Sequence, residues 1–382
     1  MKYLVCVPDG CADEPIAELG GRTPLEAASM PTLARLAARG EVGRASVIPA
    51  GMPPGSDVGN MSILGFDPAT YHTGRAPIEA AALGIELAPD QVAYRCNLVT
   101  VGGGGRMVDF AGGHPTSEDA AKVIAALQEQ LGTEEITFHP GVQYRHILVT
   151  PTSWADARCA PPHDLSDKPV VLPTGPSAPK LQALMDASRD IVSDSDGDAN
   201  QIWLWGQGSR PALPAFRDAH GVEAGLCTAV DLIRGLGRLT DMTVVEVEGA
   251  TGWYDTSYEG KRDAALAALR DGMDLFLIHI EATDEAGHAG NLEEKVKALE
   301  SWDARVLTPL VDAMDELGPW RMLLMPDHPT PIALKTHTTD AVPWVIFDST
   351  TDGPGGVYSE AGTASSVPVP GHSLMSRLLQ RS

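Results

Sequence analysis

The chain has 382 residues, enough for two or three domains of ordinary size, and 43% of them are hydrophobic, as in globular proteins with a full core. Its formal net charge of −23 disfavours nucleic acids and anionic membranes as partners, because both require clustered lysine and arginine. The same charge means that an anionic substrate would need local cations or metal ions to bind.

Five scattered cysteines include no C-x-x-C pair. This pattern favours reduced thiols over a disulfide framework or a cysteine zinc site. The apolar run at the N-terminus ends at Pro8, too short for a secretion signal, and no stretch approaches the ~18 apolar residues of a membrane span. We therefore expect a soluble, cytoplasmic protein.

The first block of the chain alternates between strand-like and helical stretches. Strands are predicted at residues 3–7 and 42–47, and helices at residues 30–39 and 78–83. Between them, prolines and glycines lead to Ser56, which we expect at or near the N-cap of a further helix.

The pattern of predicted strands and helices changes at about Pro89. Alternating strand segments at residues 93–101 and 144–149 flank a helix at residues 117–131, and a proline-rich stretch follows. The alternation of strands and helices returns after Gly208. We therefore predict one α/β domain built from residues 1–88 and 213–382, interrupted by a smaller α+β domain at residues 89–212.

The last block predicts a mostly parallel sheet flanked by helices, because apolar strand runs again alternate with helical patterns. Its predicted helices are residues 228–239, 260–270 and 292–317, and its predicted strands are residues 243–247, 275–279, 322–325 and 344–347.

Ligand-type side chains gather where predicted strands end. Because sites in open α/β sheets lie at the carboxyl ends of the strands, we expect these side chains to meet at one edge of the sheet. Ser56 is expected beside them. The others are Asp9 after the first strand, Asp284 and His288 after residues 275–280, and Asp327, His328 and His337 after residues 322–325.

Mixed carboxylate and imidazole ligands suit Zn²⁺ or Mn²⁺, and this set is large enough for two ions. Two nearby ions can stabilise both the attacking and the leaving oxygen of a phosphoryl transfer, and a coordinated serine oxygen becomes nucleophilic. Each residue alone also has an ordinary structural interpretation. Asp9 can cap a turn, Ser56 can be only an N-cap, and Asp284 and His288 can be exposed helix residues.

Two competing motifs are absent. Pro54 excludes a G-x-S-x-G nucleophile elbow around Ser56, and Arg262 after Lys261 excludes a phosphate-binding P-loop at that lysine.

An ordered set of motifs covering nearly the whole chain resembles the alkaline phosphatase superfamily. Within it, the sequence resembles the archaeal-type 2,3-bisphosphoglycerate-independent phosphoglycerate mutases. The motifs are Asp9-Gly10, Pro54-Gly55-Ser56-Asp57, Thr73-Gly74-Arg75, Asp284-x-x-x-His288, Asp327-His328 and His337.

The resemblance implies an alkaline-phosphatase-like fold with an inserted cap domain that closes over the substrate. It implies that Ser56 is the nucleophile and becomes phosphoserine. One ion would be held by Asp284, His288 and His337, and the other by Asp9, Ser56, Asp327 and His328. Mn²⁺ and Zn²⁺ are the leading candidates, with Mg²⁺ and Co²⁺ as further ones.

The implied activity is that of an isomerase of glycolysis and gluconeogenesis, which interconverts 3-phosphoglycerate and 2-phosphoglycerate. Lys261 is a candidate to neutralise phosphoryl charge, although it can equally be an ordinary exposed helix lysine. Arg95, His114 and Arg145 in the insertion are candidates for binding the substrate carboxylate and phosphate. The oligomeric state stays open, with a homo-oligomer among the options.

Other activities fit the same core residues. Pro162-His163-Asp164 and the run from Trp203 to Gly208 resemble a branch proposed to act as homoserine kinases. A metal-dependent phosphatase or a phosphopentomutase would use the same ions and serine. A non-catalytic nucleotide- or metal-binding module would be favoured if Ser56 lay far from the ligand residues.

Overall fold

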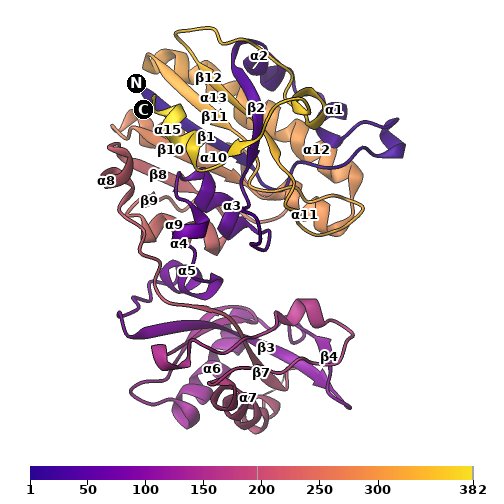
Figure 1. Cartoon of the computed structure of the whole chain (residues 1–382), viewed down its shortest axis with the longest axis vertical. Coiled ribbons are helices and arrows are strands. Elements are labelled where there is room, and N and C mark those ends of the chain that lie inside the picture. Colours follow the sequence, from indigo (N-terminus) through magenta and orange to yellow (C-terminus); the bar gives the residue numbers. More distant parts are fainter. Residues whose placement is uncertain (196, 381–382) are drawn as a thin grey trace. The chain divides into compact units, whose positions relative to one another are not determined.

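The computed structural model describes residues 1–195 and 197–380, which form two compact units (Figure 1). Unit 1 comprises Met1–His72 and Leu213–Ser382, and unit 2 comprises Thr73–Ala212. We expected the insertion to begin at residue 89, whereas unit 2 begins at Thr73. The reason is helix α5 (Arg75–Ala82), whose Ala76 and Ala80 pack into a cluster with apolar side chains of the unit 2 sheet.

The large sheet of unit 1 has eight strands in the order β13-β2-β12-β11-β1-β10-β8-β9. Neighbouring strands are parallel except in the β11–β12 and β12–β2 pairs. This confirms the predicted α/β class with a mostly parallel sheet. The strands are β1 (Lys2–Pro8), β2 (Glu41–Ser46), β8 (Ala224–Cys227), β9 (Thr243–Val244), β10 (Leu275–Ile280), β11 (Trp320–Leu324), β12 (Val342–Asp348) and β13 (Val369–Pro370).

Strand β1 lies at the centre of this sheet, between β10 and β11, and runs parallel to both. Val5 is opposite Leu277 on one side and Leu323 on the other. Because helices cover both faces, the three strands are almost entirely apolar and buried, as expected for parallel strands. Their carboxyl ends consequently meet at the same edge of the sheet.

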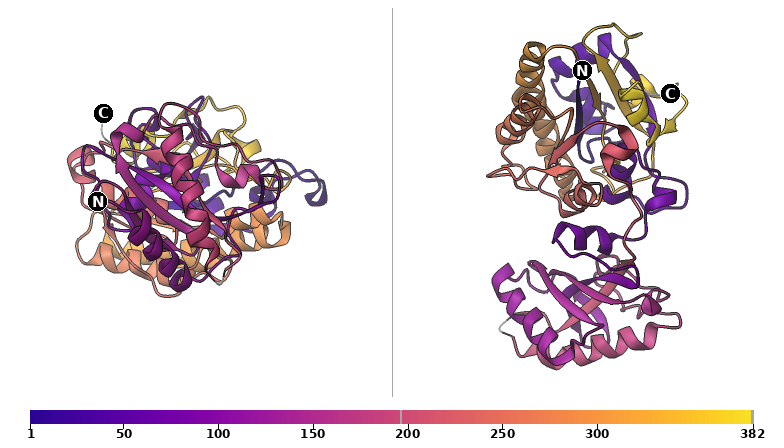
Figure 2. Two further views of the ribbon diagram at one scale, coloured as in Figure 1. Left: turned by 90° about the horizontal axis from the view of Figure 1, so that it is seen from below. Right: turned by 90° about the vertical axis from the view of Figure 1, so that its left-hand side faces the viewer.

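Helices pack against both faces of the large sheet (Figure 2). One face is covered by α2 (Pro31–Arg39), α10 (Tyr258–Arg270), α12 (Leu292–Trp302) and α13 (Thr308–Met314). On the other face, α9 (Asp231–Leu239) contacts β8 and α15 (Ser373–Leu378) contacts β11, while α3 (Ser56–Ile63) packs on both helices. The shorter helices are α1 (Pro24–Ala27), α4 (Pro68–Tyr71), α8 (Phe216–His220), α11 (Ala282–Ala289) and α14 (Glu360–Thr363).

The helix predicted for residues 292–317 is not continuous. A π-helical turn at Asp303–Leu307 separates α12 from α13. Pro309 explains the break, because it has no backbone N–H to donate to the carbonyl of Arg305 four residues earlier. That carbonyl instead accepts a hydrogen bond from Nη1 of Arg262 at 3.1 Å.

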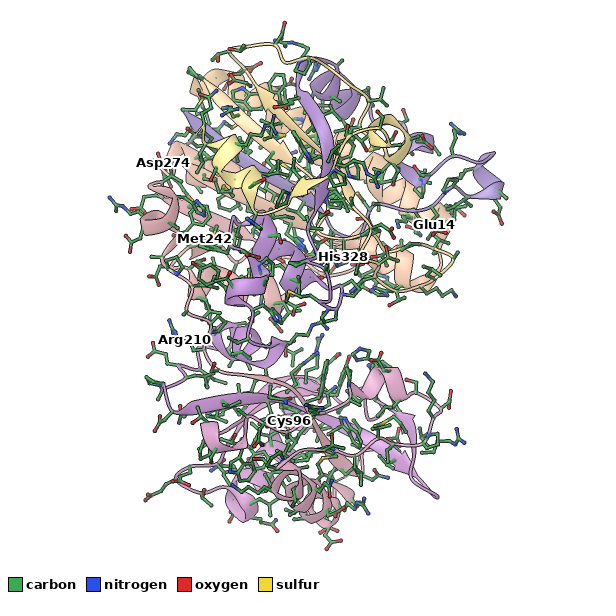
Figure 3. The ribbon with its side chains drawn as sticks, in the orientation of Figure 1. Glu14, Cys96, Arg210, Met242, Asp274 and His328 are labelled. Carbon is green, nitrogen blue, oxygen red and sulfur yellow. The ribbon has the colours of Figure 1, made fainter. Side chains whose placement is uncertain are left out.

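The small sheet of unit 2 is antiparallel, with strand order β4-β3-β6-β5 and β7 paired to β3. Helices α6 (Ser117–Leu131) and α7 (Ala178–Ser193) pack on it around Trp203, Tyr94 and Leu204, and Cys96 lies within the sheet (Figure 3). The strands are β3 (Gln91–Gly102), β4 (Arg106–Asp109), β5 (Thr137–Val142), β6 (Arg145–Pro151) and β7 (Gln201–Gly208).

All five cysteines are free, and four of them are buried. None of the helices within residues 1–195 and 197–380 combines the length and the apolar character that crossing a bilayer requires.

His146 should make the stability of the chain sensitive to acid. It is buried on β6, where Nδ1 accepts a hydrogen bond from Gly141 at 3.0 Å, and burial lowers its pKa to about 4. Because an unfolded histidine titrates near pH ~6.5, acid favours the unfolded chain, and stability present at neutral pH is lost as the pH falls. From about pH 7.5 to about pH 5 the loss from this residue should be about 2 kcal/mol.

Urea unfolding of the wild type and of His146→Gln at both pH values measures this contribution. The glutamine variant can still accept the Gly141 hydrogen bond but cannot titrate, so it should lose less stability in acid. An equal loss in both proteins would show that His146 does not carry the effect.

Candidate active site

The candidate site lies at the carboxyl ends of β11, β1 and β10. Asp327, Asp9 and Asp284 follow these three adjacent strands, as the sequence predicts. Gly10 makes their close approach feasible. It has a φ of +59°, and a Cβ there would overlap Asp284 Oδ1 and the Thr330 hydroxyl. Its backbone N–H donates to Asp327 Oδ1 at 3.3 Å.

The six predicted carboxylate and imidazole ligands form two groups, Asp9–Asp327–His328 and Asp284–His288–His337. Within each group the ligand atoms lie within 4.8 Å of one another. The groups adjoin, because the rings of His328 and His337 have centroids 3.9 Å apart. Asp9, Asp327 and His328 are called the first group, and Asp284, His288 and His337 the second group.

Ser56 lies beside the first group. Its Oγ is 3.1 Å from Nε2 of His328, which is placed near α3 in Figure 3. Ser56 was expected at or near the N-cap, and this is confirmed, since the N-cap is Gly55 and Ser56 is the first residue of α3. The serine side chain therefore makes no cap hydrogen bond and faces the ligand group. A remote Ser56, the feature that would favour a non-catalytic module, is not observed.

Asn60, one turn after Ser56, connects α3 to the loop that carries Asp327. Its Nδ2 donates to Asp327 Oδ2 at 2.8 Å and to the backbone oxygen of Ser56 at 3.0 Å. Gly59 makes this contact feasible, because a Cβ at that position would overlap the carbonyl oxygen of Asp327. The sequence analysis missed Asn60, although its i+4 spacing from Ser56 was a signal that both side chains share a helix face.

The hydrogen bonds of Thr330 determine which nitrogen of His328 carries a proton. The Thr330 hydroxyl donates to Asp284 Oδ1, and His328 Nδ1 lies 3.2 Å from the same hydroxyl oxygen. A hydroxyl has one proton to donate, so Nδ1 of His328 must be the donor in the second contact. Burial lowers the pKa of His328 to about 4, so its Nε2 is an acceptor directed at Ser56 and the carboxylates.

The first group has the properties of a cation site. Its inward-facing atoms are His328 Nε2 and carboxylate oxygens, all acceptors, and Asp9 Oδ1 is buried without a hydrogen-bond partner. Burial, together with repulsion from Asp327 and Asp284, raises the pKa of Asp9 well above its usual range. A divalent cation would relieve this repulsion and supply the missing partner, so the residues fit a bound metal ion.

The second group is held together by hydrogen bonds. Burial alone would raise the pKa of Asp284, but His288 and His337 bring it well below its usual range. For His288, burial would lower the pKa, yet the bond to Asp284 raises it to about 9. Nδ1 of His288 lies 3.0 Å from the carbonyl oxygen of Lys335, which leaves Nε2 facing Asp284 and His337.

Lys261 is not an exposed helix lysine. It is fully buried, and its Nζ forms an ion pair with Glu281 and donates to the backbone oxygen of His279 at 2.9 Å. The lysine is buried because α10 packs on β10, so its side chain reaches the backbone oxygen of His279 near the end of that strand.

The three substrate-binding candidates belong to unit 2. Arg95 on β3 pairs with Glu79, with Nε 2.9 Å from Oε2, and its guanidinium stacks over Trp205 at 4.2 Å. Arg145 lies on the neighbouring strand, opposite the residue two positions after Arg95, so both arginines share one face of the sheet. Nε of Arg145 is buried without a partner.

His114 lies in a loop of unit 2, with a φ of +52°. Its ring packs edge-on against Tyr144, next to Arg145, with centroids 5.6 Å apart. It also lines a cavity of about 730 Å³ between α6 and α7. The three candidates are thus near one another, while the seven ligand and nucleophile candidates all belong to unit 1.

Lys295 and Asp13 form a second support that sequence reasoning missed. Both are buried, and Nζ of Lys295 donates to Asp13 Oδ2 at 2.8 Å and to the backbone oxygen of Thr330 at 2.7 Å. Asp13 also accepts from the backbone N–H of Ile332 at 3.1 Å. This pair ties the loop after β1 to the loop after β11, which carries the ligands.

Comparison with known proteins gives a consistent family. The family model described as 2,3-bisphosphoglycerate-independent phosphoglycerate mutase matches residues 37–197. A probable enzyme of that name from Geobacter sulfurreducens is 44% identical over 404 aligned residues, with 100% of both chains covered. One from Methanosarcina acetivorans is 45% identical, covering 94% of this chain and 93% of the relative. The chain belongs to the 2,3-bisphosphoglycerate-independent phosphoglycerate mutase family.

Solved structures agree with this membership. A cofactor-independent phosphoglycerate mutase from Thermoplasma acidophilum is 26% identical and superposes with a TM-score of 0.67, covering 100% of this chain and 99% of that one. A Pyrococcus horikoshii protein is 25% identical with a TM-score of 0.80, covering 100% of this chain and 98% of that one. The family indicated by the sequence motifs is confirmed, and with it the class of enzyme, an isomerase.

Replacing Gly59 by alanine tests the close contact between α3 and the Asp327 loop. In an ordinary helix interior this change would stabilise by up to ~1 kcal/mol. Here the new methyl group overlaps the Asp327 carbonyl, so we expect a loss of about 1–3 kcal/mol and, because Ser56 moves with the helix, about 100-fold lower activity.

Gly103→Ala is the control, because a Cβ at Gly103 meets no atom within 4 Å. Thermal unfolding and a mutase assay should leave this control close to the wild type. A stabilised and fully active Gly59→Ala would contradict the tight packing.

Proposed function

We propose that this chain interconverts 3-phosphoglycerate and 2-phosphoglycerate through a phosphoserine formed on Ser56. The observation that carries the proposal is the position of Ser56 Oγ, 3.1 Å from His328 Nε2, beside two adjoining groups of metal-type ligands. Membership of the mutase family supplies the substrate class. We place the reaction in glycolysis and gluconeogenesis, in the cytoplasm, with phosphoglycerate as the small-molecule partner.

Two divalent ions, Mn²⁺ or Zn²⁺ first among the candidates, would supply Lewis-acid stabilisation of phosphoryl charge and lower the pKa of the serine hydroxyl. Asp9, Asp327, His328 and Ser56 would hold one of them, and Asp284, His288 and His337 the other.

The reaction is a pair of phosphoryl transfers that balance without an added donor. Ser56 Oγ attacks phosphorus, the bond from phosphorus to the glycerate oxygen breaks, and the serine proton ends on that oxygen. The free glycerate then presents its other hydroxyl, which takes the phosphoryl group from Ser56 and returns the proton. Water must be kept away between the two steps, because hydrolysis of the phosphoserine would give a phosphatase.

The N-terminus of α3 favours the charge that builds up on Ser56. Backbone N–H groups of a first helical turn and the positive end of the helix dipole attract anions. Ser56 is the first residue of this eight-residue helix, and the N-cap supplies no side-chain hydrogen bond there. Arg145 and Arg95 of unit 2 are the proposed cations for the substrate carboxylate and phosphate, since guanidinium groups bind both in a bidentate manner.

Ser56→Ala should abolish mutase activity while leaving the fold intact, because it removes the attacking oxygen. The matched control is Ser62→Ala in the same helix, whose hydroxyl donates to the carbonyl oxygen of Val47 at 2.6 Å. It should cost about 1 kcal/mol of stability and keep the activity. Conversion of 3-phosphoglycerate is followed in an enolase-coupled assay, and undiminished turnover by Ser56→Ala would exclude the covalent step.

Removal of divalent ions should also abolish turnover. Dialysis against EDTA is expected to inactivate the enzyme, and added Mn²⁺ should restore it, because both groups offer the carboxylate and imidazole atoms that bind divalent cations. Activity that resists chelation in protein shown by elemental analysis to be metal-free would contradict the role of the ions.

The choice of substrate has a direct test. The enolase-coupled assay with 3-phosphoglycerate is run beside a second reaction that offers homoserine and a phosphoryl donor. We expect 2-phosphoglycerate in the first and no homoserine phosphate in the second. The opposite result would assign the chain to a homoserine phosphotransferase, and release of inorganic phosphate alone would assign it to a phosphatase.

A further inference from the structure

We propose that His279, held in place by Glu281 and Lys261, is a positioning residue that orients the Asp9 carboxylate and thereby controls metal occupancy of the first group alone. This inference rests on the metal-binding part of the proposed function. It gives a role to Lys261 that differs from contact with the phosphoryl group, and it extends the site to buried side chains that are not ligands.

A continuous row of buried polar side chains leads from α10 to the first group. Lys261 forms an ion pair with Glu281, whose Oε1 lies 3.2 Å from Nδ1 of His279. On its other side, Nε2 of His279 lies 3.4 Å from Oδ2 of Asp9, a charge contact that is not a hydrogen bond, and this buried nitrogen has no hydrogen-bond partner. The exposed fractions of Lys261, His279, Glu281 and Asp9 are 0%, 0%, 2% and 2%, so water does not screen these contacts.

Glu281 is fixed from several directions, which makes it a rigid support for the histidine. Its Oε1 accepts from the hydroxyl of Thr228 at 3.0 Å and from the backbone N–H of Ala229 at 2.7 Å. Burial would raise the pKa of Glu281, but Lys261 and His279 lower it to about 2, so the carboxylate stays ionised and accepts only. The ring of His279 therefore has one edge held by Glu281 and the other directed at Asp9.

The two oxygens of Asp9 face different partners. Oδ2 faces His279, whereas Oδ1 faces Nε2 of His328 at 3.5 Å and has no hydrogen-bond partner. The contact with His279 lies on the Oδ2 side of the carboxylate, which leaves Oδ1 available to a cation in the first group. Without His279 the carboxylate could rotate away from the neighbouring negative charge of Asp327. Loss of such an outer partner typically weakens metal binding by about 10–100-fold.

The second group does not depend on this row of side chains. Asp284 accepts from Thr330, and His288 is held by the backbone oxygen of Lys335 at 3.0 Å. His337 contacts Asp284 and His288, and among the described residues no hydrogen bond or ion pair joins this group to His279 or Lys261. The two groups should therefore respond differently when His279 is replaced.

The test is a titration of metal-free full-length protein with Mn²⁺, following bound ions by calorimetry and by the electron paramagnetic resonance signal. The wild type should bind two ions. In His279→Leu, which has no donor, one ion should bind as in the wild type and the other about 10–100-fold more weakly. His279→Gln, which retains an N–H that can reach Asp9, should restore most of the lost affinity.

Further variants identify the affected group. His288→Ala should weaken the other ion, and the double variant with His279→Leu should retain no tightly bound ion. His146→Gln, a buried histidine in unit 2, is the control and should keep both ions. If His279→Leu fails to fold, Thr228→Val removes one support of Glu281 and should weaken the same single ion.

Two results would overturn the proposal: unchanged binding of both ions in His279→Leu, or equal weakening of both. Failure of the proposed mutase activity is distinguishable from these, because it would leave two bound ions in a protein that does not isomerise phosphoglycerate.

Discussion

Three buried carboxylates, those of Asp9, Asp284 and Asp327, meet at one edge of the large sheet, and their repulsion is the constraint on which the site depends. The three carboxylates lie close together because β11, β1 and β10 are parallel neighbours, so their carboxyl ends lie at the same edge of the sheet. Burial and this repulsion raise the pKa of Asp9 well above its usual range. Such an arrangement is costly in a folded protein unless cations complete it.

The surrounding side chains are consistent with a site built for cations. Thr330 links the two groups, because it donates to Asp284 and leaves His328 with its Nε2 lone pair facing the first group. Two buried lysines lie near the ligand residues without contacting the ligand atoms. Lys295 pairs with Asp13 between the ligand loops, and Lys261 pairs with Glu281. These fixed positive charges offset part of the negative charge without occupying the ligand atoms, so the site stays open to ions and to the phosphoryl group.

The sequence predicted that the ligand-type side chains would gather at one edge of the sheet, because sites lie at the carboxyl ends of parallel strands. It could not predict the support behind them. His279 is the next-to-last residue of the apolar, buried strand β10, and it resembles a core residue until β1 and β10 are known to be neighbours. The partner of Lys261 depends on the packing of α10, which helical periodicity does not specify. The alanine-rich α5 fits either domain equally well by composition, and only its packing on Ala93 and Ile147 assigns it to unit 2.

The proposed mechanism requires two ions beside Ser56, and anomalous diffraction from crystals grown with Mn²⁺ tests this most directly. We predict two anomalous peaks, one coordinated by Asp9, Asp327, His328 and the Ser56 oxygen, the other by Asp284, His288 and His337. A single peak shared by both groups, or peaks remote from Ser56, would contradict it.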